Sequence, residues 1–322
     1  MAVKHEILRV LEENKGAPRS GEMLAEQLHV SRAAVWKAVK ELQKEGHAID
    51  AATNKGYTLR TTSDVLSAEG ILPYLADGTV RVEAHQCLAS TNLTAKELAA
   101  AGAPHGSVVA ASQQTAGRGR RGRAFASPAN TGLYLSILLR SALPMGSAAL
   151  ITSAAAVAVC RALHTVCGKD DVQIKWVNDL YTGGKKCCGI LTEAAADMET
   201  GGIDYIIVGI GLNLLPPEGG FPPELAEIAT AIFPAGATVP RCRLAAEITN
   251  EVLVLCNSLP DASFMEEYRA RNFVPGRDIT IVQNGTQRPA KALAITDDGH
   301  LVVRLPDGAQ EELSFGEISI RV

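Results

Sequence analysis

The sequence has few aromatic residues, no strong excess of charge and no paired-cysteine motif. Phe, Trp and Tyr together make up 4% of the 322 residues, charged residues 20%, and hydrophobic residues 47%. The seven cysteines form no CxxC pair and no spacing typical of a metal site. These absences exclude a disulfide-stabilised scaffold and a zinc-finger protein. The composition is typical of a soluble globular protein whose cysteines are small apolar residues in a reducing compartment.

Long apolar runs are also missing. The most apolar stretch, residues 148–160, ends at Arg161 and is too short and too rich in Ala, Ser and Thr to span a bilayer. Lys4, His5 and Glu6 come too early for a signal peptide, and no apolar block follows them. We therefore expect a cytoplasmic protein with no membrane partner.

The net charge is −4, but it is unevenly distributed along the chain. Residues 1–60 hold ten Lys/Arg against eight Asp/Glu, whereas the remainder holds twenty-one against twenty-seven. Four arginines are concentrated in "GRGRRGR" at residues 117–123. Any nucleic-acid contact is therefore predicted at the N-terminus or in this arginine-rich segment. The length of the chain predicts two or three domains.

The N-terminal pattern predicts a winged helix-turn-helix over residues 1–62. Apolar residues recur at helical spacing in residues 3–11, and Ser20 and Ser31 are placed to begin two further helices. Gly46 ends the third helix, and residues 47–50 and 57–60 follow as a hairpin. Two helices joined by a short turn, followed by a hairpin, are typical of DNA readers.

Residues on the second helix of this motif and at the hairpin tip are the predicted DNA contacts. Basic side chains there are placed where phosphates and base edges would lie. The alternatives are a solvated basic face and a protein-docking module. The predicted contacts are Ser20, Ser31, Arg32, Ala33, Trp36, Lys37, Lys40 and Lys55, with Lys44 and Asn54 beside them.

The central region, residues 66–270, alternates predicted strands and helices, which indicates a mixed α/β or α+β domain. Helices are expected near residues 91–101, 147–166 and 241–258, and a long surface loop with one short helix over 215–238. Residues 274–322 alternate apolar and polar positions between Gly-containing turns, which predicts a small antiparallel β-barrel. Strands are expected near residues 80–84, 107–112, 132–140, 172–177, 188–193 and 203–213.

The arginine-rich segment lies between two predicted strands, so it is a loop of a folded domain. Glycine lets a backbone close over a ligand, and guanidinium groups bind phosphate and carboxylate. Without a bound anion, we expect these arginines to lack a partner and to repel one another, so that the loop is disordered. "KWVND" at residues 175–179 and Lys186 nearby suggest a nucleoside triphosphate with Mg²⁺. Taken alone, each of these residues could instead be structural: Lys175 a surface residue, Trp176 part of the core, and Asn178 and Asp179 a turn.

Six segments in order resemble the biotin protein ligases. They are "STN" (90–92), "QQTAGRGRRGR" (113–123), "SPANTGLYLS" (127–136), "KWVNDLY" (175–181), "KKCCGILTE" (185–193) and "GIGLN" (209–213). With the N-terminal motif, the chain resembles the bifunctional bacterial form, biotin–[acetyl-CoA-carboxylase] ligase and biotin operon repressor. This implies a multidomain α+β fold: a winged helix-turn-helix, a mixed-sheet ligase domain like class II synthetases, and an SH3-like C-terminal barrel.

The resemblance implies a two-step acyl transfer. Biotin and MgATP give biotinyl-5′-adenylate, which then acylates a lysine of a biotin carboxyl carrier protein. No metal-ligand motif is present, so Mg²⁺ would arrive with ATP. The implied biotin ligands are Ser90, Thr91, Asn92, Gln114, Arg118, Gly119, Arg120 and Lys186. The implied adenylate ligands are Trp176, stacking on adenine, with Asn178, Asp179 and Asn213, and Asn213 is expected to line the same cavity. Arg118, Arg120, Lys186 and Asp179 are the implied catalytic groups.

This sequence departs from the family pattern at three points. Val177 stands where the family has a proline. Thr115 changes the spacing, so that Gln114 rather than Gln113 aligns with the biotin-binding position. Lys185 is an alternative to Lys186 as the ligand-binding lysine. Three other functions remain open: a lipoate-type protein ligase, a transcription factor whose central domain only senses a small molecule, and a ligase with an idle winged helix.

The repressor interpretation carries an expectation about assembly. The adenylate-bound form would be a homodimer that binds an inverted repeat in operator DNA. The strand at residues 203–213 is a candidate edge for side-by-side pairing, because an apolar edge strand is a liability when it is unpaired.

Overall fold

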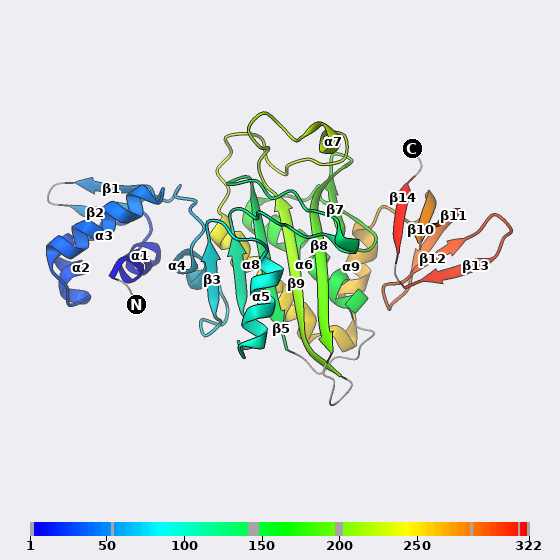
Figure 1. The fold of residues 1–322 in the computed structure, drawn as a ribbon, viewed down its shortest axis with the longest axis horizontal. Coiled ribbons are helices and arrows are strands. Elements are labelled where there is room, and N and C mark those ends of the chain that lie inside the picture. Colours follow the sequence, from blue (N-terminus) through cyan, green and yellow to red (C-terminus); the bar gives the residue numbers. More distant parts are fainter. Residues whose placement is uncertain are drawn as a thin grey trace.

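The computed structural model describes residues 3–52, 55–140, 148–196, 202–283, 286–314 and 316–320. Figure 1 shows three parts in a row: a small helical part with a hairpin, a central sheet with helices, and a second, antiparallel sheet at the opposite end. The central sheet and the parts on either side of it position the functional groups.

The N-terminal part is a helix-turn-helix followed by a hairpin, as predicted. Ser20 and Ser31 cap α2 and α3, because their hydroxyls accept hydrogen bonds from Met23 N (3.0 Å) and Ala34 N (3.1 Å). A separate apolar core, which includes Ile7, holds the three helices together. The elements are α1 (Val3–Glu13), α2 (Gly21–Gln27), α3 (Arg32–Lys44), β1 (Ile49–Ala52) and β2 (Gly56–Leu59).

The central domain is built on a seven-stranded mixed sheet in the order β3-β4-β5-β9-β8-β7-β6. Strands β3 and β4 pair parallel, and the other neighbouring pairs are antiparallel. All six predicted strands are present, and β7 is an additional strand that was not predicted. The strands are β3 (Val82–His85), β4 (Val108–Ala111), β5 (Gly132–Leu139), β6 (Gln173–Lys175), β7 (Asp179–Thr182), β8 (Lys185–Ala196) and β9 (Ile203–Asn213).

The expectation that residues 203–213 form a free edge is wrong. Strand β9 lies in the interior of the sheet, paired with β5 on one side and β8 on the other. Its backbone groups are therefore already hydrogen-bonded within the domain. Its apolar side chains, such as Ile207 and Val208, are fully buried and belong to two different hydrophobic clusters. The ends of the sheet are β3 and β6.

Helices cover the central sheet and connect it to its neighbours. The three predicted helices are confirmed as α5, α6 and α8, and the short helix predicted within residues 215–238 is α7. Helices α4 and α9 were not predicted. The helices are α4 (Ala68–Ile71), α5 (Thr91–Ala100), α6 (Ala148–Cys167), α7 (Pro223–Ala226), α8 (Arg241–Asn257) and α9 (Phe264–Arg271). Short 3₁₀ turns lie at η1 (Leu72–Tyr74), η2 (Arg120–Gly122) and η4 (Leu259–Asp261).

Helix α6 runs past the apolar stretch to Cys167 and is, by length and composition, able to cross a membrane. Two thirds of its most apolar window, 67%, is buried inside the protein. Its buried residues, among them Ile151 and Leu163, belong to the main hydrophobic core. It is packed as the core helix of a globular domain.

The C-terminal part is a five-stranded antiparallel sheet in the order β13-β12-β11-β10-β14. Its apolar residues are continuous with the core of the central domain, so the two parts share one hydrophobic cluster from Leu66 to Ile318. Trp176 joins them directly, because its indole Nε1 donates to the Gly299 carbonyl (2.9 Å). The strands are β10 (Asp278–Gln283), β11 (Thr286–Ile295), β12 (Leu301–Arg304), β13 (Gln310–Leu313) and β14 (Glu317–Ile320).

Candidate functional site

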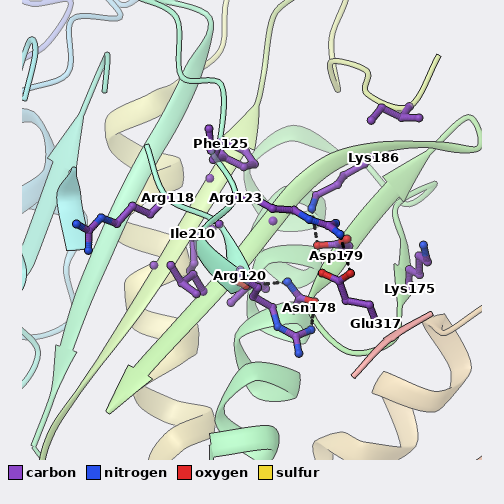
Figure 2. A pocket seen from close by; sticks show the side chains of 18 of the residues that line it. Arg118, Arg120, Arg123, Phe125, Lys175, Asn178, Asp179, Lys186, Ile210 and Glu317 are labelled. Atoms are coloured by element: carbon purple, nitrogen blue, oxygen red, sulfur yellow. Dashed lines mark hydrogen bonds and ion pairs between the residues drawn. The ribbon is translucent and has the colours of Figure 1, made fainter. Parts of the chain in front are cut away.

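A cavity of about 510 Å³ lies where the central sheet, the arginine loop (residues 117–123) and the C-terminal sheet meet. Figure 2 shows its side chains converging from these three sources. One end is lined by small neutral polar groups and the other by cations and carboxylates. The predicted site residues that line it are Ser90, Thr91, Asn92, Gln114, Arg118, Gly119, Arg120, Trp176, Asn178, Asp179 and Lys186.

The neutral end is built on the first turn of α5. Gln114 ties this turn to the neighbouring loop: its Oε1 accepts from the Thr91 backbone N (2.8 Å) and hydroxyl (3.1 Å), and its Nε2 donates to Ser127 Oγ (2.9 Å). Ser90 occupies the N-cap position, but its side chain makes no capping hydrogen bond. It is buried at 2% exposure beside the cavity. Its hydroxyl is thus a polar group that the helix does not use.

The Asn92 amide is already held by the protein. Its Oδ1 accepts from the buried Ser136 hydroxyl (2.6 Å), and its Nδ2 donates to Glu193 (2.8 Å). A Cβ atom at Gly209 would lie 2.1 Å from that Oδ1, so glycine is required there. The structure brings Asn92 to the cavity, but with its amide turned toward the sheet. Its predicted contact with biotin stays a prediction.

An aromatic wall lies between the two ends of the cavity. The Phe125 ring packs against Gly211, where a Cβ atom would lie 2.6 Å from the ring. Its other neighbour is Tyr134, whose ring meets it edge-on with centroids 6.5 Å apart. Phe125 was not predicted. The signal that could have found it is the glycine at positions 211 and 189, because a Cβ atom there would lie 2.6 Å and 3.2 Å from the ring.

The arginine loop is held by protein partners. Arg120 donates to Asn178 Oδ1 (2.8 Å) and to the Gly316 carbonyl (3.2 Å), while Arg123 pairs with Glu317 (2.8 Å) (Figure 2). The expectation that these arginines have no partner within the protein is wrong, because the C-terminal sheet supplies carbonyl and carboxylate oxygens that no local pattern indicates. Burial lowers the pKa of Arg120. Arg118, in contrast, is exposed and points away from this group.

The charged end contains an ion pair between two neighbouring strands. Lys186 Nζ lies 2.6 Å from Asp179 Oδ1, although no hydrogen bond of suitable angle reaches that oxygen. Asn178 is fixed by donation from its Nδ2 to the Ile190 carbonyl (2.9 Å). Lys185 donates instead to the Ala226 carbonyl (2.6 Å) and does not line the cavity. The structure therefore favours Lys186 over its rival.

Two predicted adenylate residues lie differently from the expectation. The Trp176 side chain is 4% exposed and its indole N–H is bonded to Gly299, so its ring is not open to a stacked base. Asn213 ends β9 and is not among the residues that line the cavity; its carbonyl accepts from the Ile232 backbone N (2.9 Å). The expectation that Asn213 lines the cavity is wrong, and both adenylate contacts stay predictions.

Three further side chains line the charged end without having been predicted. Lys175 has a pKa lowered by burial, and its ammonium lies 5.6 Å from the centroid of the Tyr181 ring. Ile228, 59% exposed, reaches the rim because its carbonyl accepts from the Lys186 backbone N (2.9 Å). Glu317 enters from β14. Lys175 stood in a quoted motif, but the other two come from distant segments with no local signal.

Three family matches cover most of the chain. Residues 4–58 match a family described as "HTH domain", residues 84–213 the Biotin/lipoate A/B protein ligase family, and residues 276–321 the Biotin protein ligase C terminal domain. Among curated proteins, the Bifunctional ligase/repressor BirA of Bacillus subtilis (strain 168) is 34% identical over 307 residues, 91% of both chains. The chain belongs to the bifunctional ligase/repressor family.

Other members of this ligase/repressor family match a smaller share of the chain. BirA of Escherichia coli (strain K12) is 36% identical over 200 residues, which is 62% of this chain and 60% of that protein. A solved biotin protein ligase from Aquifex aeolicus, in complex with biotin and ATP, superposes with a TM-score of 0.62 at 22% identity. It covers 75% of this chain and 98% of the Aquifex chain, so the two proteins share a fold over that part.

The helix-turn-helix of this ligase/repressor presents its predicted DNA face to solvent. Arg32, Ala33, Lys37 and Lys40 are exposed on α3, and Lys55 beside the hairpin is exposed too. Trp36, on the same helix, is 57% exposed, which is unusual for so large an apolar ring. Ser20 and Ser31 act as helix caps, and Asn54 lies outside the described residues. The DNA contacts themselves stay predictions.

Proposed function

We propose that the protein joins biotin to ATP and then to a carrier protein. The biotin carboxylate attacks the α-phosphorus of ATP, pyrophosphate leaves, and biotinyl-5′-adenylate forms. The ε-amine of a carrier lysine then attacks the acyl carbon, loses a proton, and AMP leaves. The observation that supports this reaction is a single cavity whose neutral polar end and cationic end are joined by the Phe125 wall. A ligand with a neutral ring, an aliphatic chain and a carboxylate fits that order of environments.

Each end of the cavity has a distinct part in the proposal. Ser90, Thr91 and Gln114 would bind the ureido ring through neutral hydrogen bonds. Lys186 and Arg120 would offset the charge on the carboxylate and the α-phosphate, which is the main way an enzyme can accelerate phosphoryl-type displacement. Ile228, exposed at the rim of the cavity, is the candidate adenine contact. Asp179 is the carboxylate that would accept the proton of the carrier lysine.

The residues present fit a magnesium ion carried by ATP. Asp179 and Glu317 are the carboxylates among the residues that line the cavity, and Asp179 Oδ1 is buried without a hydrogen bond. Within the described residues, no group of three or more His, Cys, Asp or Glu is placed to hold a metal alone. Two carboxylates with substrate phosphates and water are the ligands that Mg²⁺ prefers. The ion would supply charge neutralisation at the phosphates.

The first test is carrier labelling. The purified protein is incubated with biotin, MgATP and a biotin carrier domain, and the mass of the carrier is measured. A gain of one biotin on one lysine, with AMP released, supports the proposal. Labelling with lipoic acid in place of biotin would establish the lipoate-type alternative. If neither acid labels the carrier or releases AMP, the remaining interpretation is a transcription factor whose central domain only senses a small molecule.

We also propose that the adenylate-bound protein represses biotin genes as a homodimer on an inverted repeat. The exposed basic face of α3 and the relatives named ligase/repressor support this part. Because β9 is already paired on both sides, the dimer contact must lie elsewhere. Sedimentation with and without biotin and MgATP tests it: an unchanged molecular mass contradicts ligand-driven dimerisation.

The remaining structural and cellular assignments are proposals too. The domain limits are 1–62, 66–270 and 274–322. The C-terminal sheet would close as an SH3-like barrel, and the central domain would share the architecture of class II synthetases. Five short antiparallel strands and a mixed sheet are consistent with these assignments. We place the protein in the cytoplasm, without a membrane partner.

A further inference from the structure

Glu193 lies just outside the cavity and binds two successive turns of α5. Its carboxylate accepts from Asn92 Nδ2 (2.8 Å) and from Lys96 Nζ (2.6 Å). Positions 92 and 96 are one helical turn apart, so a single carboxylate on β8 can reach both. Glu193 is not among the residues that line the cavity. It therefore cannot act by touching a ligand there, and any effect on one must pass through a neighbour.

Asn92 is that neighbour. Its side chain is enclosed on three sides: the Ser136 hydroxyl at Oδ1, Glu193 at Nδ2 with the Leu191 carbonyl 3.4 Å away, and the bare backbone of Gly209. Ser136 is fully buried and Asn92 is 4% exposed. An amide whose oxygen and nitrogen both have partners at this depth has one orientation. The position of the helix at residue 92 is therefore fixed relative to the sheet.

The residues fixed with it are the ones that face the cavity. Ser90 and Thr91 directly precede Asn92 in the first turn of α5. Hydrogen bonds with a neutral ligand need heavy-atom distances within a few tenths of an ångström, so a small rotation of this turn would misplace both hydroxyls. We propose that Glu193 is a positioning residue for biotin binding: through Asn92 it holds Ser90 and Thr91 in register with the ureido ring. This inference rests on the function proposed above.

The charge on Glu193 is part of this role. Burial alone would raise the pKa of Glu193, but the hydrogen bonds from Lys96 and Asn92, together with the positive charges of Lys96 and Arg118, lower it. The carboxylate is therefore ionised at neutral pH and accepts from both donors. A glutamine at this position would keep the shape but direct its NH₂ group at one of two donors, which breaks one of the two hydrogen bonds.

The test is steady-state ligation by Glu193→Gln, with biotin and ATP varied separately. We expect KM for biotin to rise about ten-fold, while kcat and KM for ATP change less than about two-fold, because the loss affects ground-state binding at one end of the cavity. Lys96→Met is the matched control, since it removes the second donor and leaves the Asn92 bond. It should raise KM for biotin by less than about three-fold.

A double-mutant cycle separates positioning from a general loss of stability. If Glu193 acts through Asn92, adding Glu193→Gln to Asn92→Ala changes KM for biotin little further, because the link is already broken. Equal changes in both KM values, an unchanged KM for biotin, or additive effects would each overturn the proposal. Should Glu193→Gln fail to fold, Glu193→Asp replaces it under the same criteria. A wild-type protein that labels no carrier would refute the proposed function instead.

Discussion

Lys186 Nζ lies 2.6 Å from Asp179 Oδ1, across the hairpin formed by β7 and β8. The cation proposed for the biotin carboxylate and the carboxylate proposed for the metal thus neutralise one another within the protein. A substrate carboxylate or phosphate must therefore compete with Asp179 for Lys186, whereas Mg²⁺ bound to Asp179 would release it. The ion pair therefore couples the roles proposed for these two residues.

Lys186→Met is expected to lower kcat for adenylation by about 100-fold, because it removes a positive charge where negative charge develops. Lys185→Met is the matched control on the adjacent position. Its ammonium contacts the Ala226 carbonyl outside the cavity, so less than about a three-fold change is expected. Pyrophosphate release measures both. Equal losses in the two variants would contradict the assignment of Lys186.

Arg120→Gly is expected to release the reactive adenylate. The variant removes both the Asn178 and the Gly316 hydrogen bonds and so loosens the loop, which then keeps the exposed Arg123–Glu317 ion pair. Biotinylation of an unrelated lysine-rich protein in solution reports the leak. Arg121→Gly is the control, since Arg121 is exposed and has a positive φ of 55° that glycine adopts readily. If Arg120→Gly labels bystanders no more than wild type does, the arginine loop does not retain the adenylate.

Arg123→Gln and Glu317→Gln distinguish two roles for Glu317: an ion-pair partner of Arg123 and a metal ligand. The Arg123 side chain is 70% exposed, so this ion pair contributes at most about 1 kcal/mol, and its loss alone should change KM for ATP only about two- to three-fold. Glu317 also lines the cavity, and its substitution should raise the Mg²⁺ concentration needed for half-maximal activity. That requirement is measured at fixed ATP. Identical Mg²⁺ profiles for the two variants would remove Glu317 from the metal site.

His47 should make the protein less stable in mild acid. Burial lowers its pKa from 6.5 to about 4, with the charges of Glu45, Lys15, Glu69 and Lys4 as smaller influences. Between these two values the unfolded chain binds more protons, so stability is lost as pH falls from about 6.5 to about 4, by about 3 kcal/mol.

The measurement for His47 is the difference in unfolding free energy between wild type and His47→Phe, taken at pH 7 and at pH 4. The variant keeps a ring at a site that is 5% exposed but cannot gain a proton. Burial raises the pKa of Glu12, which acts in the opposite sense as pH falls, but its contribution is the same in both proteins and cancels. A difference that is independent of pH would show that His47 is not the titrating group.

Lys37→Ala should weaken binding to a generic DNA duplex of about 30 base pairs and reduce the slope of log affinity against log salt by about one. Trp36→Ala should weaken binding without changing that slope, since no charge is lost. Lys291→Ala is the control, because this exposed lysine belongs to β11 in the C-terminal sheet at the far end of the molecule (Figure 1). If all three variants bind alike, the α3 face is not the DNA contact.

Much of the local structure follows from short-range patterns. Ser20 and Ser31 cap helices where the sequence predicts it, and the apolar periodicities of α6 and β9 are those of buried elements. The motifs also indicated which segments gather at one site. These features depend on residues within one or two turns of each other, so they can be predicted without knowing the fold.

Local patterns were enough to predict most helices and strands, a three-part organisation and the ligase motifs, but not β7, α4 or α9. Contacts between distant segments place β9 inside the sheet, turn Lys186 rather than Lys185 to the cavity, and bond the Trp176 indole to Gly299. They also bring Glu317 to the arginine loop and turn Asn92 toward Glu193. The reason is physical: sheet order and side-chain pairing sum many weak contacts between distant segments, and no local pattern records which segment will supply the partner.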